Sequence, residues 1–313
     1  MSAIDPLAEI VTLLQPAARF SKQVTCTAPW RIQRDGTGEP FYCAILEGAC
    51  RIAFGTEPPL ELRAGDFVLA PAMRALRIES VDAPAELPET VPEQLGAGHF
   101  HVGPRGGSAE LRMRIGHCRF GAPDSALLVS LLPDRVIVRD QPRLATLMQL
   151  IDEEARAQRA AHELVLERLL EVLLIEAMRS ASATTTAPGL ARGLADERLA
   201  AALRAMHAHP DRAWTMAMLA QEAALSRSAF FARFSRSVGL PPMEYLLTWR
   251  MALAKQLLRQ PDLGLEQVAQ RVGYGSASAF SVAFARQVGM PPARYARAEA
   301  ASRAGAGAPA HAM

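Results

Sequence analysis

The sequence VGLPPMEY at residues 238–245 returns as VGMPPARY at residues 288–295. The similarity extends upstream, where LAQEAALS (219–226) matches VAQRVGYGS (268–276) with one additional residue in the turn. Six residues recur 50 positions later: Phe230, Phe234, Gly239, Pro241, Pro242 and Tyr245 return as Phe280, Phe284, Gly289, Pro291, Pro292 and Tyr295. This regularity predicts two copies of one structural unit in the C-terminal third of the chain.

Each copy of the repeat predicts a short helix, a tight turn and a second helix that begins after a capping serine, Ser226 or Ser276. Two helices joined in this way form the unit that places a recognition helix in the major groove of DNA. Phe230, Phe234 and Val238 are four residues apart and should face the core, which leaves the opposite face for DNA. The alternative, two ordinary helical hairpins with solvated arginines, does not account for the regularity of the repeat.

A helix that joins the two copies is predicted from Pro242 to Gln260, with Pro242 in its first turn and Pro261 after its end. At about 1.5 Å per residue this helix spans roughly 28 Å. That length is close to the ~34 Å between successive major grooves on one face of B-DNA. One chain can therefore reach two adjacent grooves.

The formal charge of +2 hides an asymmetry along the chain. Residues 1–195 carry a net charge of −4 and residues 196–300 a net charge of +5, which suggests that the second half meets a polyanion. Together with the predicted helix-turn-helix units, this makes double-stranded DNA the expected partner. Hydrophobic residues make up 50% and charged residues 21%, the balance of an ordinary globular protein. The length of 313 residues suggests two domains, each large enough to bury a core.

Short apolar runs broken by Gly and Pro fill residues 24–138 and predict a β-rich domain. The runs on either side of Glu47-Gly48 predict a hairpin that sets Ile45 opposite Cys50. Residues 80–110 lack periodicity, so we expect a long loop there.

Two helices are predicted at residues 142–158 and 161–179, and both have broad apolar faces. A second copy of the chain is the simplest partner for such faces, so we expect a homodimer. The predicted fold is α+β, with four parts: a β-barrel sensor domain with dimerisation helices at 1–180, a linker at 181–195, an all-α domain with two helix-turn-helix motifs at 196–300, and a flexible tail at 301–313.

No apolar run approaches the roughly 20 residues that span a bilayer. The start of the sequence, MSAIDPLAEI, also lacks the features of a signal peptide. We therefore expect a cytoplasmic protein that does not contact membranes. The four cysteines all lie in the first half and are too few for a disulfide scaffold, so they are expected to be thiols.

Six segments of the C-terminal hundred residues share their residue types and spacing with a known family. They are W-T-x-x-x-L-A (214–220), S-R-S-x-F-x-x-x-F (226–234), G-x-P-P-x-x-Y (239–245), R-x-x-x-A-x-x-L (250–257), V-A-x-x-V-G-Y (268–274) and a second G-x-P-P-x-x-Y (289–295). Through them the sequence resembles the DNA-binding domain of AraC/XylS-type bacterial transcription regulators. The resemblance implies a transcription regulator that is not an enzyme, and an activator with RNA polymerase as a further partner.

In that family, base contacts come from the outward positions of both recognition helices. The resemblance assigns this role to Ser228, Phe231, Ala232, Ser278, Ser281 and Val282, with Ser276 beside them. Ala232 and Val282 cannot donate a hydrogen bond, so readout there should depend on thymine methyl groups and on DNA shape. Phosphate contacts are expected from Arg227, Arg233, Arg236 and Arg286.

The β-rich half resembles the cupin-like sensor domain of a subset of these regulators. The similarity lies in FYCAILEGACRIAF (41–54), LRAGDFVLAP (62–71) and GHCRFGAPDSALLVSLLP (116–133). Metal-binding cupins carry histidines at the places held here by Tyr42 and Leu76, so neither a metal nor another cofactor is expected. The remaining histidines of this half, His99, His101 and His117, are expected to be ordinary loop and strand residues.

The cysteines divide into two groups by position. Alternation along the strand places Cys118 on the face of Arg112 and Arg114, where positive charge favours the reactive thiolate. Cys43 and Cys50 lie on an apolar face and are expected to be structural.

Two of the cysteines also match a resemblance. Cys26, in the context T-C-x-x-x-W, and Cys118 are similar in position to a pair in regulators that respond to hypochlorous acid and related chlorine species. In those relatives the pair senses the oxidant and can form a disulfide, which implies a redox-sensing role for Cys26 and Cys118 here. The main alternative is a small molecule bound in the cupin-like domain, with unreactive thiols. A cupin enzyme fused to a DNA-binding domain and a constitutive DNA-binding protein are further alternatives.

Overall fold

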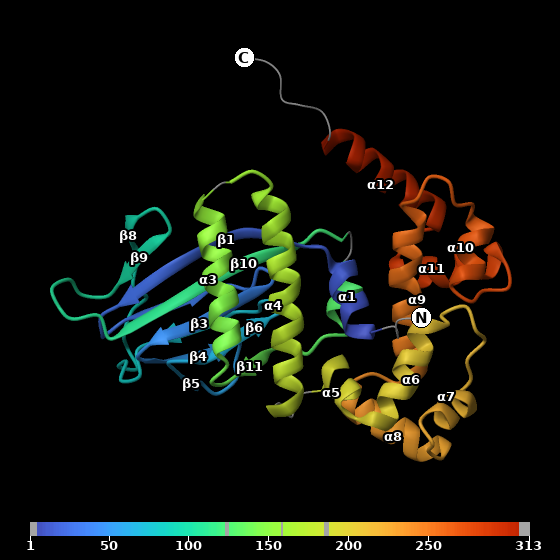
Figure 1. Cartoon of the computed structure of the whole chain (residues 1–313), viewed down its shortest axis with the longest axis horizontal. Coiled ribbons are helices and arrows are strands. Elements are labelled where there is room, and N and C mark those ends of the chain that lie inside the picture. The colour runs from blue at the N-terminus through green and yellow to red at the C-terminus, as the bar shows by residue number, and fades with distance from the viewer. Residues whose placement is uncertain (1–4, 123–124, 158, 185–187, 307–313) are drawn as a thin grey trace. The chain divides into compact units, whose positions relative to one another are not determined.

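The computed structural model describes residues 5–122, 125–157, 159–184 and 188–306. They group into two compact units (Figure 1), each described here by itself. The β unit comprises Leu14–Gly121 and Leu132–Ala187. The helical unit comprises the residues up to Leu13, residues 122–131 and the residues from Pro188 onward.

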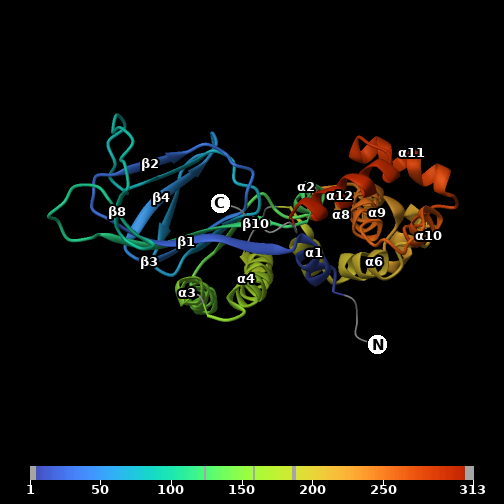
Figure 2. The same ribbon diagram turned by 90° about the horizontal axis from the view of Figure 1, so that it is seen from above.

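Two β-sheets enclose the apolar core of the β unit (Figure 2). The larger sheet has the strand order β11-β6-β3-β10-β1-β9-β8, and the smaller sheet has the order β2-β7-β4-β5. The strands are β1 (Pro16–Cys26), β2 (Arg31–Arg34), β3 (Phe41–Glu47), β4 (Ala49–Phe54), β5 (Leu60–Arg63), β6 (Phe67–Ala70), β7 (Leu76–Glu79), β8 (Glu93–Gly96), β9 (His99–Val102), β10 (Leu111–Phe120) and β11 (Val136–Val138). The fold class is α+β, as the sequence predicted.

The expected hairpin between β3 and β4 is wrong. Ile45 of β3 pairs with Met113 of β10, and Cys50 of β4 pairs with Leu62 of β5. The chain instead passes from one sheet to the other at Gly48, whose φ of +80° is readily adopted by glycine. The apolar residues of both strands still share one core, because the inner faces of the two sheets point toward each other.

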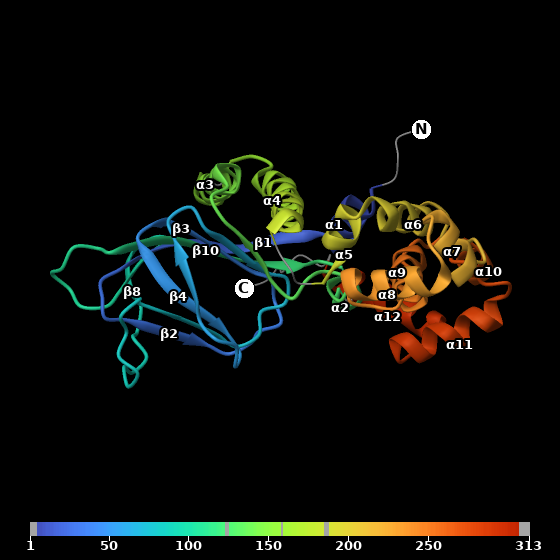
Figure 3. The same ribbon diagram turned by 90° about the horizontal axis from the view of Figure 1, so that it is seen from below.

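Helices α3 (Pro142–Ala157) and α4 (His162–Thr184) cover the outer face of the larger sheet (Figure 3). They pack against β1, β3 and β11, so most of the apolar residues for which we expected a second copy as partner are buried within the chain. The buried residues include Leu144, Met148, Ile151, Leu166, Leu170, Leu173 and Leu174. Leu150, Leu164, Val165 and Val172 remain exposed.

Residues 80–110 contain two short strands rather than only a loop. β8 and β9 pair with each other, and β9 also runs parallel to β1 through His99–Val102 and Gln23–Cys26. Both strands are four residues long, and β8 is exposed throughout. Strands this short and polar carry too little hydrophobic pattern to be recognised in the sequence.

The helical unit is built from ten helices of the described chain. They are α1 (Pro6–Leu14), α2 (Ala126–Val129), α5 (Leu190–Ala195), α6 (Glu197–Ala208), α7 (Met216–Glu222), α8 (Arg227–Val238), α9 (Pro242–Leu258), α10 (Leu265–Arg271), α11 (Ala277–Val288) and α12 (Pro292–Ala306). The pairs α7–α8 and α10–α11 are the two predicted helix-turn-helix motifs. None of the helices in the described ranges of the chain is both long and apolar enough to cross a membrane.

Two expected irregular segments contain helix. The expected linker at 181–195 includes the end of α4 and the whole of α5, whose Leu190 is buried. Residues 185–187 of that linker lie outside the described residues. The expected tail at 301–313 begins inside α12, and its residues 307–313 also lie outside the described residues.

Helices α1 and α2 come from the first half of the sequence but belong to the helical unit. The Glu9 carboxylate of α1 lies 2.7 Å from Nδ1 of His207 in α6. On the other side of this imidazole, Nε2 lies 2.8 Å from the Tyr245 hydroxyl of α9. Helix α2 packs against α9.

Candidate functional site

The first helix-turn-helix motif consists of α7 and α8. The Ser226 hydroxyl accepts a hydrogen bond from the N–H of Ala229 at 3.3 Å, which caps α8 as predicted. Phe230 and Phe234 are fully buried, and the Phe234 ring packs edge-on against Tyr245 of α9. These contacts fix which face of α8 points outward.

The residues of α8 that were predicted to contact DNA lie on its outward face. Arg227, Ser228, Ala232 and Arg236 are exposed, and Phe231 is 49% exposed. Arg233 is also exposed, but its guanidinium donates to the Asp196 carboxylate at 2.5 Å. Arg233 is therefore held by an ion pair within the unit, and a phosphate would have to compete with Asp196 for it.

The second motif consists of α10 and α11 and repeats the arrangement of the first. The Ser276 hydroxyl accepts from the N–H of Ala279 at 3.2 Å and caps α11. Ser278 and Arg286 are exposed, and Val282 is 70% exposed. The half-buried Ser281 donates its hydroxyl to the carbonyl oxygen of Ala277 at 2.7 Å.

The two outward faces therefore differ in what they offer to bases. Ser276 and Ser281 have backbone partners within α11, whereas Phe231 and Val282 are large apolar side chains left in solvent. Exposed apolar groups on a recognition helix are suited to contact with thymine methyl groups. Arg236 and Arg286 occupy corresponding places near the ends of α8 and α11.

Helix α9 connects the motifs and is anchored by Arg250. The Arg250 guanidinium donates to the carbonyl oxygens of Pro210 at 2.8 Å and of Arg212 at 2.7 Å. Gly273, in the turn between α10 and α11, lies directly against this guanidinium: a Cβ there would be 2.4 Å from Nη2 of Arg250. The position of α9 is thus tied both to the chain after α6 and to the turn of the second motif.

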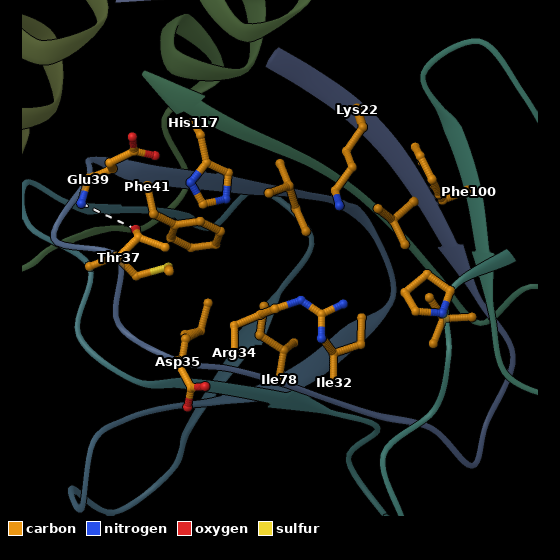
Figure 4. Close-up of a pocket in the computed structure, with 16 residues that line it drawn as sticks. Lys22, Ile32, Arg34, Asp35, Thr37, Glu39, Phe41, Ile78, Phe100 and His117 are labelled. Atoms are coloured by element: carbon orange, nitrogen blue, oxygen red, sulfur yellow. Dashed lines mark hydrogen bonds between the residues drawn. The ribbon is translucent and has the colours of Figure 1, made fainter. Parts of the chain in front are cut away.

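A cavity of about 280 Å³ lies between the two sheets of the β unit (Figure 4). Its walls are mostly apolar and include Val24, Ile32, Phe41, Leu76, Ile78 and Phe100. Lys22, Arg34, Asp35, Glu39 and His117 supply the charged or titratable groups of the lining. This cavity could not be predicted from the sequence, because its walls come from strands that are distant in the sequence.

The positions compared with metal-binding cupins lie in different surroundings. Leu76 lines the cavity, whereas Tyr42 faces the opposite side of β3, where its ring packs against Gly116. His117 also lines the cavity and packs edge-on against Phe41 at 5.4 Å between ring centroids, whereas His99 is exposed. Within the described residues, no three His, Cys, Asp or Glu side chains converge as metal ligands would.

The two cysteines assigned to redox sensing lie far apart. Cys26 pairs with Leu111 at one end of the β1–β10 ladder, and Cys118 pairs with Ala18 near the other end. Seven residues of an extended strand separate Leu111 from Cys118, about 23 Å. A disulfide requires Cα atoms within about 7 Å, so this fold does not permit a Cys26–Cys118 disulfide.

The expected thiolate character of Cys118 is also wrong. Cys118 does lie on the face of β10 that carries Arg112 and Arg114, but it is fully buried, and burial raises the pKa of its thiol to about 12. The two arginines are paired with carboxylates: Arg112 with Glu47, and Arg114 with Asp152 of α3 at 3.5 Å. The sequence indicated the face correctly but not that α3 and α4 cover it.

Comparisons with known proteins agree with both halves of this description. Residues 5–183 match the cupin family, and residues 219–298 match a helix-turn-helix domain. The chain is 34% identical over 284 residues to an AraC-like transcription regulator of Streptomyces lividans, covering 87% of this chain and 91% of that protein. It is 24% identical over 277 residues to the RCS-specific transcriptional activator RclR of Escherichia coli, covering 87% of this chain and 90% of that protein.

One solved structure similar to the helical unit is the DNA-binding domain of the transcription factor AdpA in complex with a target DNA. The match has 34% sequence identity and a TM-score of 0.31, and covers 34% of this chain and 93% of that chain. The relatives over the full length are transcription regulators rather than enzymes. The two helix-turn-helix motifs, the cupin barrel and the full-length similarity together show that this chain belongs to the AraC family of DNA-binding transcription regulators, with a cupin domain in its N-terminal half.

Proposed function

We propose that this regulator binds two successive segments of the major groove with α8 and α11, and that a signal received in the β unit controls transcription. The observation that carries the first part is the repetition of one outward face, with Arg236 and Arg286 at corresponding places on the two helices. Helix α9 between them has 17 residues and is about 26 Å long, which suits the spacing of adjacent grooves.

A small-molecule effector in the cavity of the β unit is the signal that the geometry supports best. Lys22 and Val24 of β1 line this cavity, as do Ile115 and His117 of β10. The chain runs directly from the start of β1 back into α1, and from the end of β10 on toward α2. Since α1 and α2 both pack within the helical unit, a ligand that shifts β1 or β10 has a covalent route to the DNA-binding half.

Two further partners are proposed for a transcription regulator of this kind: a second copy of the chain and RNA polymerase. A homodimer formed through the exposed apolar residues of α3 and α4 would bring two helical units to one promoter. As an activator, the DNA-bound protein would contact RNA polymerase.

A second candidate signal is oxidation of single cysteines, supported by the similarity to the E. coli activator, whose name marks it as RCS-specific. In this scheme hypochlorous acid converts the thiol of Cys118 or of Cys26 to a sulfenic acid, with chloride and a proton leaving. Burial of both thiols requires local opening of the barrel before the oxidant can react. A reporter strain settles this candidate: Cys118→Ala or Cys26→Ala should abolish an oxidant response, and a full response in the double variant would contradict it.

The salt dependence of DNA affinity tests the proposed use of the two motifs. Arg236→Ala and Arg286→Ala should each weaken binding and flatten the slope of log Kobs against log salt by about 0.9, the loss of one phosphate contact. Arg63→Ala is the matched control, because Arg63 is an exposed arginine of β5 in the other unit. Unchanged slopes in both α8 and α11 variants would contradict the proposed placement.

A further inference from the structure

The cavity in the β unit combines an apolar body with a cationic end. Ile32, Ile78 and Phe100 lie at the same end of the cavity as Lys22 and Arg34 (Figure 4). Apolar walls of this kind contribute affinity for an apolar ligand, while a few polar groups fix its orientation. The volume of about 280 Å³ limits the ligand to a small molecule.

The two cations enter the cavity from opposite walls. Lys22 extends inward from β1, and Arg34 extends inward from the end of β2 (Figure 4). The Arg34 guanidinium also donates to the Glu89 carboxylate at 2.5 Å, so a ligand would share Arg34 with Glu89. Burial lowers the pKa of Lys22, and the positive charge of Arg34 lowers it further, so the two groups are close enough to repel each other. An anion between them would reduce this repulsion and would accept charge-assisted hydrogen bonds from Lys22 and, together with Glu89, from Arg34.

The carboxylates of the lining are placed differently. Asp35 and Glu39 lie at the other end of the cavity, and their carboxylates point away from its centre (Figure 4). They would disfavour a second negative charge on the ligand at that end. The walls near Lys22 also offer few neutral hydrogen-bonding groups, so a sugar would leave several hydroxyl groups unsatisfied there.

We infer that this cavity binds a small monocarboxylate with an apolar body, whose carboxylate lies between Lys22 and Arg34 and whose body packs on Ile32, Ile78 and Phe100. The inference deepens the proposed function, because it names the chemical class of the effector. It also assigns separate roles to the two parts of the site. The cations select for the charge, and the apolar walls select for the size and shape of the body.

Calorimetric titration of the full chain with matched probes tests the inference. The probes are phenylacetate and octanoate, and their controls are phenylacetamide and octanamide, which have the same size but no charge. We expect at least one carboxylate to bind with a Kd below about 1 mM and its amide to bind roughly 10- to 100-fold more weakly. If neither carboxylate binds in that range, or if the amides bind as tightly, the inference is overturned.

Variants assign the charge selectivity to its residues. Lys22→Met and Arg34→Met should each weaken carboxylate binding by roughly 10- to 100-fold and leave amide binding unchanged. Arg63→Met, an exposed arginine of β5 outside the cavity, should bind the carboxylate as the unaltered chain does. Unaltered carboxylate binding in both Lys22→Met and Arg34→Met would show that the probe binds elsewhere, and it would contradict the inference.

DNA affinity measured on the same samples separates this inference from the proposed function. Carboxylate binding that leaves DNA affinity and promoter activity unchanged would contradict control by the cavity but not the ligand class. Intact sequence-specific DNA binding without carboxylate binding would contradict the ligand class but not the role of the two motifs.

Discussion

Burial governs what the four thiols of this protein can do. Cys26, Cys43 and Cys50 lie in the core between the two sheets, and Cys118 is buried on the outer face of the larger sheet, the face that α3 and α4 cover (Figure 3). The largest effect on each thiol is the removal of its charged form from water, which raises the pKa of all four. At neutral pH these cysteines therefore behave as small apolar residues rather than as nucleophiles.

The raised thiol pKa values predict how stability depends on pH. Above about pH 8.5 the unfolded chain loses thiol protons while the folded chain keeps them, so the free energy of unfolding falls as pH rises. Between pH 8.5 and 9.5 each thiol should contribute about 1 kcal/mol to this fall. Urea unfolding at both pH values should show a smaller fall for Cys118→Ala than for the unaltered chain. If the free energy of unfolding falls equally in Cys118→Ala and in the unaltered chain, burial does not raise the pKa of the Cys118 thiol in the folded state.

Ala224 carries backbone strain in the turn of the first helix-turn-helix motif. Its φ is +49°, the left-handed region, and the corresponding residue in the second motif is Gly273, with φ +80°. An alanine in this region is disfavoured by roughly 1–2 kcal/mol. Glycine relieves this strain, but it loses more conformational entropy on folding, so the net gain in stability is smaller than the strain.

We expect Ala224→Gly to stabilise the protein by about 0.5 kcal/mol and to raise its Tm. Ala205→Gly, within α6, is the control and should lower stability by about 1 kcal/mol. The reverse change in the second motif, Gly273→Ala, should destabilise, because its Cβ would lie 2.8 Å from the Pro210 carbonyl oxygen. A lower Tm for Ala224→Gly would show that the turn is not strained.

At the scale of helices and strands, the sequence predicted local features better than distant pairings. The caps Ser226 and Ser276 and the buried Phe230 and Phe280 are confirmed, because the helical period and cap residues act within a few positions. The pairing of β3 with β10 was missed, because it joins residues about 70 positions apart and competes with the short turn at Gly48. The base and phosphate contacts of α8 and α11 stay predictions.

The exposed apolar residues of α3 and α4 predict a dimer. Leu150, Leu164 and Val172 lie on surfaces that do not contact the sheet, and they are 43%, 53% and 38% exposed. Analytical ultracentrifugation of the full chain at micromolar concentration should show a dimer, and the double variant Leu164→Glu/Val172→Glu should sediment as a monomer. Val91→Glu, at a residue 84% exposed outside these helices, is the control and should stay dimeric. A monomeric unaltered chain would contradict the prediction.

At the scale of the whole molecule, the two units are interleaved in sequence. The sequence suggested one passage between them, near residue 190, but α1 and α2 of the first half belong to the helical unit. No local pattern could show this, because the apolar face of α1 is compatible with packing in either unit. The buried His207 joins Glu9 of α1 to Tyr245 of α9, and burial lowers the pKa of this histidine. These contacts make α1 an integral part of the DNA-binding half.

Hydroxyl-radical footprinting tests most directly whether one chain uses both motifs on DNA. On a binding site selected from random sequence, we predict two protected segments on one face of the duplex, centred about 10 base pairs apart for each chain bound. Arg236→Ala should weaken protection at one segment and Arg286→Ala at the other. A single protected segment for each chain bound, or loss of the same segment in both variants, would contradict the account.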